Sequence, residues 1–369
     1  MAAQTRPPAG DENAAAGAAQ RLVSLDAFRG FVMLWIIGGG TLVKSFREID
    51  ANWLTDWLVY QLEHSDWTGL RFYDLIWPGF MLMTGMSLPF SYRSRLRRGA
   101  SHEEILRHVG WRCAILFLLG SLRESVHLKQ PFLIELSSAL QPIAIAYFCA
   151  FLLVRSRARA QAAVAAGIWA GYAAMLALVP PASYERGNNL VLSVDLAAFR
   201  RTLPEGWGTV LSTIPTISTT ILGMILGRFL MGPATGARKA SIIAALGGAC
   251  FAAGWALSPL IPVVMKLWTT SYGLASTGAA CLMFAAFYWV IDVRGRQRWV
   301  LPLVVIGRNA LAAYLGQTLV PLRSHVGIFT QAPAAALGAW GPAFGNVVYL
   351  VVEWLILYWM YKRKLFLTA

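Results

Sequence analysis

The sequence predicts an all-α, polytopic membrane protein, and three observations support this fold class. Hydrophobic residues occupy 57% of the 369 positions and charged residues only 14%, whereas a soluble domain is about one quarter charged. Apolar runs of about 20 residues, the length that a helix needs to cross a bilayer, recur along the chain. Short basic clusters separate these runs, which is typical of the loops that set membrane topology.

Ten apolar runs are predicted to span the membrane as helices. With approximate boundaries they are 27–44, 70–91, 108–125, 133–154, 162–180, 210–230, 240–259, 271–291, 300–320 and 343–361. Basic clusters follow every second run, and they are Arg93/Arg95/Arg97/Arg98, Arg155/Arg157/Arg159, Arg228/Arg238/Lys239, Arg294/Arg296/Arg298 and Lys362/Arg363/Lys364. Because cytoplasmic loops are enriched in Lys and Arg, we expect about ten spans with both termini in the cytoplasm.

The first 20 residues differ from the rest of the chain. Residues 1–20 are rich in Ala, Gly and Pro without hydrophobic periodicity, so a disordered N-terminal tail is expected there. No signal peptide is expected, because no charged segment precedes a short apolar core. Residues 21–369 are interpreted as a single transmembrane domain.

Charge and cysteine content argue against nucleic-acid binding, a disulfide framework and a metal site. The chain has 32 Lys and Arg against 18 Asp and Glu, a formal net charge of +14. In a soluble protein this excess would indicate nucleic-acid binding, but here the basic residues lie between apolar runs, so no nucleic-acid partner is expected. The four cysteines lie inside apolar runs without CxxC or Cys/His spacing, so neither a disulfide framework nor a metal site is predicted.

The candidate site lies in the segment 61–88. There a polar, aromatic stretch with His64, Asp66 and Trp67 runs directly into an apolar run that carries Asp74 near its start. If Asp74 orients the imidazole of His64, the pair forms a base with a fixed tautomer. The alternative is that His64 is a solvated or structural residue at the membrane boundary.

Several charged or amide side chains lie within predicted spans and therefore need a partner or a function. Asp26 and Arg29 are neighbours on one helix face; the pair either fixes the first helix or leaves Arg29 to bind a phosphorylated cofactor. Arg308 and Asn309 fall near the middle of the ninth span, at a depth similar to that of Glu353 in the tenth. We expect Arg308 and Glu353 to pair, either as an internal staple or as the lining of a polar shaft.

Two further segments on the predicted outer side carry polar and aromatic side chains. The loop 181–209 mixes amides, carboxylates and aromatic residues, which suits a sugar and equally suits a solvated loop. Lys266 and Trp268 flank the start of the eighth span, as interfacial anchors do. They are candidate substrate contacts together with Asp66 and Trp67.

The sixth span carries a row of hydroxyl groups. Thr213, Thr216 and Thr220 share one helix face, and Pro215 is expected to bend the helix. Such hydroxyls either join neighbouring helices or line a polar path, and both interpretations stay open.

Five segments stand out from the apolar background, and together they resemble a known family. They are SLDAFRG (24–30), HSDWTGLRFYDLIWPGFMLMTGMS (64–87), LSSALQPIAIAY (136–147), KLWTTSYGL (266–274) and GRNALAAY (307–314). In this order they are similar to the heparan-α-glucosaminide N-acetyltransferase family and its bacterial relatives. The His-x-x-Trp-x-Gly…Asp-Leu-x-x-Pro block is fairly specific, whereas other membrane acyltransferases also begin with SLDxxRG.

This resemblance implies a multi-pass enzyme of the bacterial inner membrane that transfers acetyl from cytoplasmic acetyl-CoA to a glucosamine-type acceptor on the other side. The family's active-site histidine falls on His64, acting as general base or acetyl carrier, and its neighbouring carboxylate falls on Asp74. An Asn that the family carries late in the first span is replaced here by Gly40. Asn309 or Thr41 is expected to supply that amide's function.

The resemblance also implies partners. Acetyl-CoA is the expected acyl donor, an amino sugar or glycan the acceptor, and membrane lipid the surroundings; a homodimer is possible, and no metal is expected. The cationic and polar side chains expected to bind acetyl-CoA are Arg29, Arg93, Arg112, Arg228, Arg308 and Asn309.

Two other function classes fit the same sequence. A transporter or flippase for a sugar or lipid-linked sugar would use a polar shaft without covalent chemistry, and a membrane scaffold would use His64 only structurally. Transporters often contain an internal repeat. The two halves of this chain show no convincing repeat, which favours the acyltransferase.

Overall fold

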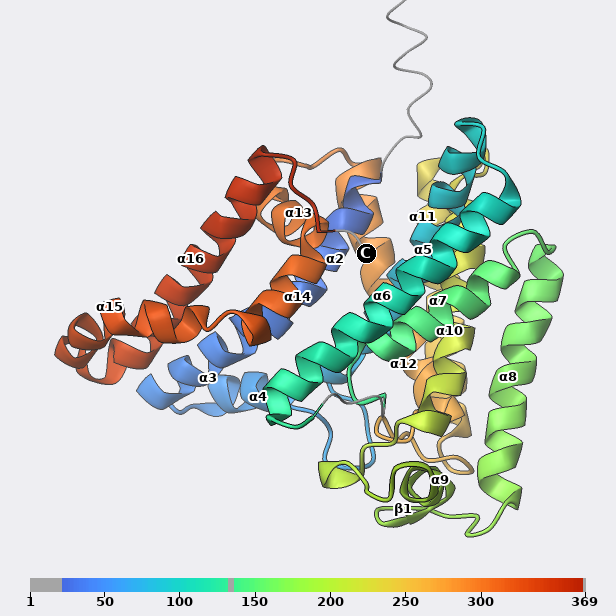
Figure 1. Cartoon of the computed structure of the whole chain (residues 1–369), viewed down its shortest axis with the longest axis horizontal. Helices are drawn as coiled ribbons and strands as arrows, with labels where there is room; N and C mark the ends of the chain where they lie inside the picture. The colour runs from blue at the N-terminus through green and yellow to red at the C-terminus, as the bar shows by residue number, and fades with distance from the viewer. Residues whose placement is uncertain (1–21, 132–135, 368–369) are drawn as a thin grey trace, which may run out of the picture.

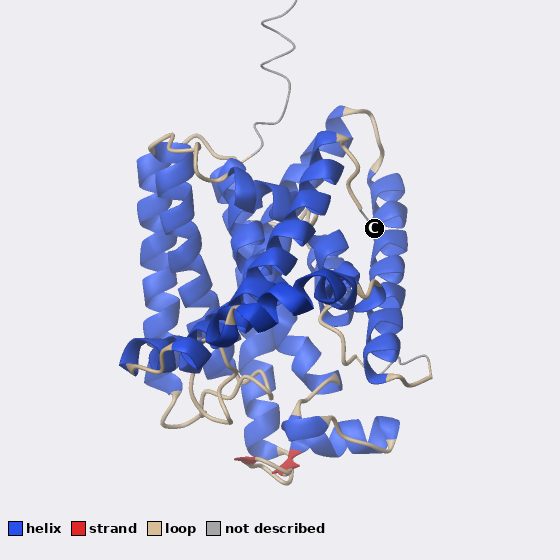
Figure 2. Cartoon of the chain, turned by 90° about the vertical axis from the view of Figure 1, so that its left-hand side faces the viewer, coloured by secondary structure: helices blue, strands red, loops and turns tan. Residues whose placement is uncertain are grey.

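The computed structural model describes residues 22–131 and 136–367, and within them the chain is almost entirely helical (Figures 1 and 2). The predicted tail, 1–20, lies outside the described residues. The one sheet found in the described part is a hairpin of β1 (Tyr184–Glu185) and β2 (Asn188–Asn189), which pair antiparallel. An all-α architecture is therefore confirmed.

The helices are joined by connections that differ widely in length. In chain order they are α2 (Val23–Leu34), η1 (Trp35–Gly39), α3 (Gly40–Ile49), α4 (Trp53–Gln61), η2 (Phe72–Leu75), α5 (Ile76–Arg97), α6 (His102–Leu128), α7 (Leu140–Leu152), α8 (Ala158–Leu178), α9 (Leu190–Phe199), η3 (Pro204–Gly206), α10 (Val210–Leu230), α11 (Gly236–Leu257), α12 (Thr270–Tyr288), η4 (Trp289–Val293), α13 (Leu301–Arg308), α14 (Ala310–Leu319), α15 (Leu322–Ala336), η5 (Gly338–Trp340) and α16 (Gly341–Lys362).

Seven helical stretches of the described chain are long and apolar enough to cross a membrane. They are Val23–Ile49, His102–Leu128, Ala158–Leu178, Val210–Leu230, Gly236–Leu257, Thr270–Val293 and Gly338–Lys362. The chain is thus a multi-pass membrane protein. The other three predicted spans correspond to α5, which ends in arginines, to the 13-residue α7, and to the ninth run, which Asn309 divides into α13 and α14.

The first span is broken at a glycine. The π-helical turn η1 separates α2 from α3, and Gly38 within it has φ +153°, a conformation that side chains with a Cβ rarely adopt. The break leaves Gly40 and Thr41 at the start of α3, on the wall of a polar cavity near His64.

Glycines set the closest helix contacts. Gly30 of α2 packs on α13, where a Cβ would lie 1.8 Å from the carbonyl oxygen of Leu303, and Gly307 of α13 packs on α2, 1.9 Å from that of Asp26. Small residues allow such close approach in membranes, where helices associate by packing rather than by the hydrophobic effect. Two of the family-like segments, 24–30 and 307–314, are thereby joined.

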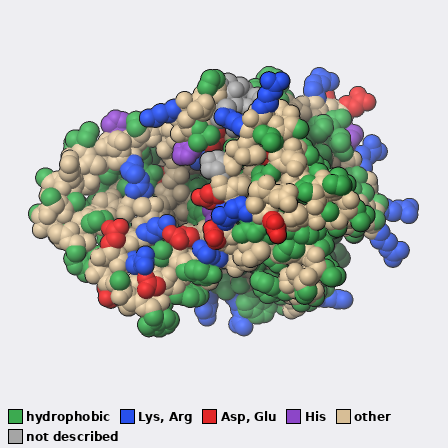
Figure 3. Space-filling view, turned by 90° about the horizontal axis from the view of Figure 1, so that it is seen from below, with side chains coloured by type: hydrophobic (Ala, Val, Ile, Leu, Met, Phe, Trp, Pro, Cys, Tyr) green, Lys and Arg blue, Asp and Glu red, His purple; other side chains and the backbone are tan. Residues whose placement is uncertain are grey.

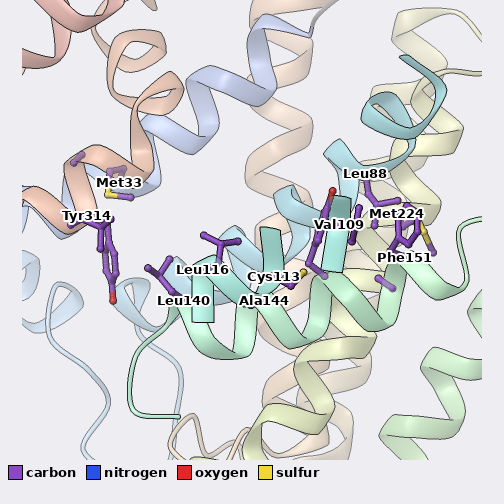
Figure 4. Close-up of a cluster of buried hydrophobic side chains, with 14 of the residues drawn as sticks. Met33, Leu88, Val109, Cys113, Leu116, Leu140, Ala144, Phe151, Met224 and Tyr314 are labelled. Atoms are coloured by element: carbon purple, nitrogen blue, oxygen red, sulfur yellow. The ribbon is translucent and has the colours of Figure 1, made fainter. Parts of the chain in front are cut away.

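One large apolar core is formed mainly by buried side chains of α2, α5, α6, α7, α10 and α14, with contributions from α8, α13 and α16 (Figure 4). At one end of the view Met33 of α2 lies beside Tyr314 of α14, and at the other Leu88 and Phe151 lie near Met224 of α10. This core holds the diagonal helix α6 against α7 and thereby positions the cavities described below.

Replacing Gly307 with Ala is expected to lower the free energy of unfolding by about 1–3 kcal/mol, because the new methyl group overpacks the contact with α2. The thermal unfolding of the detergent-solubilised protein, followed by tryptophan fluorescence, measures this. Gly316→Ala is the matched control, since a Cβ at Gly316 meets nothing within 4 Å. Equal unfolding temperatures for the two variants would contradict the close-packing interpretation.

Candidate functional site

The imidazole of His64 and the carboxylate of Asp74 form the centre of the site. His64 lies in the loop between α4 and η2, and its Nδ1 is 2.9 Å from Oδ1 of Asp74, whose side chain is fully buried. The same carboxylate accepts the backbone N–H groups of Arg71 (2.9 Å) and Ser65 (3.3 Å). Because Asp74 acts as acceptor throughout, His64 Nδ1 is the donor, and Nε2 of the neutral ring is left as an acceptor.

Two further contacts fix the loop that carries the histidine. Arg71 donates to the carbonyl oxygen of His64 (2.9 Å), and its guanidinium lies 3.9 Å from the ring centroid of Tyr60. From α12, the hydroxyl of Tyr272 donates to the carbonyl oxygen of Asp74 (2.6 Å). The loop and its imidazole are therefore held by neighbouring residues of the same segment and by one distant residue, Tyr272 of α12.

The ring of His64 faces two cavities. It packs edge-on against Tyr73 and Trp207, with centroid distances of 4.7 and 5.1 Å, and 37% of its side chain is exposed. It lines a cavity of about 560 Å³, here called the histidine cavity, together with Arg123 and Glu124 of α6. It also lines a more polar cavity of about 430 Å³, here called the vestibule.

A third cavity, of about 360 Å³, contains three of the predicted cofactor-binding residues. Arg29, Arg112 and Arg308 line it among apolar side chains, and we call it the arginine cavity. It shares part of its wall with the histidine cavity. The side chains common to both are Ile36, Ile76, Trp77, Ala139 and Tyr314. The cavity with the arginines and the cavity with His64 are therefore adjacent.

The other predicted cofactor-binding residues do not line these cavities. Arg93 is exposed near the end of α5. Arg228 donates to the carbonyl oxygens of Val154 and Ser156, beyond the end of α7. Asn309 is buried and donates to the carbonyl oxygen of Leu357 (3.3 Å).

One predicted ion pair is wrong and another is found. Arg308 does not reach Glu353; its guanidinium lies 4.0 Å from the ring centroid of Phe366 instead. Phe366 follows α16, whereas Glu353 lies in the middle of that helix, so Arg308 lies near the C-terminal end of α16. Asp26 and Arg29 do form the expected contact, at 3.4 Å.

The vestibule is bordered by paired charges. Lys44 contacts Glu63 (2.9 Å), and Lys266, whose side chain is only 2% exposed, contacts Glu205 (3.0 Å). Hydrogen bonds from these lysines lower the pKa of both carboxyls, and the bond from Arg186 lowers the pKa of Asp66 in the same way. All three acids are therefore carboxylates at neutral pH. Figure 3 shows acidic and basic side chains around a hollow on this face.

The four predicted substrate-binding residues separate into two groups. Asp66 and Lys266 line the vestibule. Trp67 does not line it; its indole donates to the carbonyl oxygen of Tyr184 (2.8 Å) and joins the loop 181–209 to the His64 loop. Trp268 is also absent from the lining, because it is buried edge-on against Trp77, at 5.0 Å.

Arg123 and Glu124 were not predicted as site residues from the sequence, which also leaves open whether the threonines of α10 line a polar path. Arg123 and Glu124 are adjacent charges inside the third predicted span, and charges at such a position often mark a functional site. This pattern could have indicated that α6 lines the site. The predicted row of Thr213, Thr216 and Thr220 donates to carbonyl oxygens one turn earlier in the chain, those of Thr209, Thr213 and Thr216. None of these three threonines lines the arginine cavity, the histidine cavity or the vestibule. Among the described residues, no group of three or more His, Cys, Asp or Glu side chains could hold a metal ion.

Comparison with known proteins adds independent information. No family model matches the chain. It is 23% identical over 435 aligned residues to human heparan-alpha-glucosaminide N-acetyltransferase, covering 94% of this chain and 59% of the human protein. A segment of 106 residues, 28% of this chain, is 30% identical to the mouse protein of the same name and covers 14% of it. The chain thus spans less than two thirds of the length of these relatives. The resemblance to the heparan-α-glucosaminide N-acetyltransferase family that the five segments predicted is confirmed.

Proposed function

We propose that the protein is a transmembrane acyltransferase that moves acetyl from cytoplasmic acetyl-CoA to an amino sugar or glycan on the outer side of a bacterial inner membrane. One observation supports this most strongly: the His64–Asp74 pair lies between a cavity that contains arginines and a vestibule bordered by carboxylates. The names of the relatives, which describe an N-acetyltransferase, fit the same chemistry.

The sidedness follows from the proposed topology. We propose that α5, α7 and the broken pair α13–α14 complete ten crossings, with both termini in the cytoplasm, as the distribution of Lys and Arg favours. The arginine cavity then opens toward the cytoplasm, where acetyl-CoA is made, and the vestibule faces outward. Arg29, Arg112 and Arg308 would bind the phosphates of CoA, since guanidinium groups suit phosphate oxygens. The acyl arm would pass Trp77 and Tyr314 to reach His64.

The chemistry uses the free Nε2 of His64. In one route Nε2 accepts the proton of the acceptor's amine or hydroxyl as that group attacks the thioester carbonyl. In the other, Nε2 itself attacks and carries the acetyl group to the acceptor. In both, Asp74 holds the ring in the required tautomer and stabilises the charge that develops on it.

The vestibule supplies recognition of the acceptor. Its carboxylates Glu63, Asp66 and Glu205 would attract the ammonium group of an amino sugar, and Trp207 offers an aromatic face beside His64. Lys44 and Lys266 would donate to hydroxyl or carboxylate oxygens of a glycan.

The direct test is to incubate purified protein with radiolabelled acetyl-CoA and a panel of glucosamine-ended sugars. His64→Ala is expected to lower kcat by about 10²–10⁴-fold, the usual contribution of a general base, and Asp74→Asn is expected to act in the same direction. His325→Ala is the control, because His325 lines none of the three cavities. Transfer that survives His64→Ala would remove this residue from the mechanism, and absent transfer with sugar flux into vesicles would favour the transporter.

The arginine cavity makes a separate prediction about the donor. Arg112→Gln and Arg308→Gln are each expected to raise the KM for acetyl-CoA about tenfold or more, since a hydrogen bond to a charged group contributes about 1.5–3 kcal/mol. Steady-state kinetics at saturating acceptor measures this. The exposed Arg93 is the matched control, and Arg93→Gln is expected to leave the KM unchanged. Equal effects of all three substitutions would place the phosphates elsewhere.

A further inference from the structure

Arg123 is a cation that lines the histidine cavity and has hydrogen-bond donors without a partner among the described residues. Its side chain is 15% exposed and that of its neighbour Glu124 is 10% exposed. Glu124 pairs with Nη1 of Arg123, while Nε is buried without a hydrogen-bond partner and no bond of Nη2 is found among the described residues. The pairing offsets the guanidinium charge but occupies only one of its nitrogens.

The position of Arg123 relates it to the transferred group. Its guanidinium lies 4.2 Å from the ring centroid of Tyr314, a residue that lines both the arginine cavity and the histidine cavity. Arg123 itself lines only the histidine cavity, and of the described residues around that cavity it is the one Lys or Arg. An acyl arm that passes Tyr314 would therefore bring its thioester beside this guanidinium, on the side where His64 lies.

Attack on a thioester places negative charge on the carbonyl oxygen, and a donor in a site shielded from water stabilises that charge strongly. Alternative donors near His64 are engaged or uncharged. The backbone N–H of Gly208 donates to the carbonyl oxygen of Lys266, and that of Thr209 donates to the carboxylate of Asp195. The hydroxyls of Ser137 and Thr209 line the cavity, but neutral donors form weaker hydrogen bonds than charged ones.

We propose that Arg123 is a further catalytic residue, whose guanidinium stabilises the oxyanion formed on the thioester. This rests on the proposed acetyl transfer. As the acceptor's nitrogen or oxygen bonds to the carbonyl carbon, its proton passes to His64 Nε2 and the C=O π electrons move to the oxygen beside Arg123. The C=O bond then re-forms, the C–S bond breaks, and the CoA sulfur takes the proton from His64. If His64 carries the acetyl group instead, Arg123 stabilises the oxyanion of each of the two steps.

The test compares Arg123→Gln and Arg123→Lys with wild-type protein, and Arg107→Gln, an exposed position on the same helix, is the control. Arg123→Gln is expected to lower kcat about 10²–10³-fold, and Arg123→Lys to restore part of the loss. Binding of acetonyl-CoA, a ketone analogue that cannot transfer acetyl, is expected to stay unchanged, because the oxyanion exists only during reaction. Arg123→Gln/Glu124→Gln repeats the measurement without a buried unpaired carboxylate, in case the single variant fails to fold.

The outcomes separate the two proposals. Inactive wild-type protein would overturn the proposed function and this inference with it. Active wild-type protein with an unchanged kcat in both Gln variants would overturn only the role of Arg123. A parallel loss of acetonyl-CoA binding and kcat would also overturn it, because Arg123 would then act on the ground state or on the fold.

Discussion

The site depends on the hydrogen bonds that the buried carboxylate of Asp74 accepts. This carboxylate accepts from His64, Ser65 and Arg71, while the carbonyl group of the same residue accepts from Tyr272 of α12. A carboxylate out of contact with water needs such donors, because an unpaired buried charge is very costly. The hydrogen bonds that stabilise this charge therefore also fix the conformation of the loop and the orientation of the imidazole. Fold and chemistry share one set of hydrogen bonds.

The surrounding helices meet a different constraint. In a membrane, packing and polar contacts rather than the hydrophobic effect drive helix association, and Gly30 and Gly307 let α2 and α13 approach closely. The segments that carry the family resemblance therefore include packing residues as well as residues of the site. Trp67 and Trp268 belong to the first kind: Trp67 joins two loops, and Trp268 packs on Trp77 of α5. Asp66 and Lys266, by contrast, line the vestibule.

Features that depend on composition or on contacts within one segment could be predicted from the sequence, whereas contacts between distant helices could not. The all-α architecture follows from composition, and the contact between His64 and Asp74 follows from a short segment that enters a span. Which arginines share a cavity depends on helix rotation and on breaks, which composition does not specify. Arg308 lies at the end of α13 and contacts Phe366, not Glu353 as predicted. The sequence did not place Arg123 in the site, because a charged residue inside an apolar run does not indicate which other helices it contacts.

The three cavities fit the proposed transfer across the membrane, because the charged part and the reactive part of the donor would occupy separate cavities. A donor with several phosphates cannot cross apolar surroundings, since desolvating charges there is costly, whereas an acetyl thioester on a slender arm is nearly neutral. A wall of Ile36, Ile76, Trp77, Ala139 and Tyr314 between the arginine cavity and the histidine cavity fits this division. Arginines would retain the charged part on one side of the wall, and only the reactive end would pass beyond it. The paired charges of the vestibule lie on the other side of His64, so in the proposed transfer the imidazole is the group that both substrates would reach.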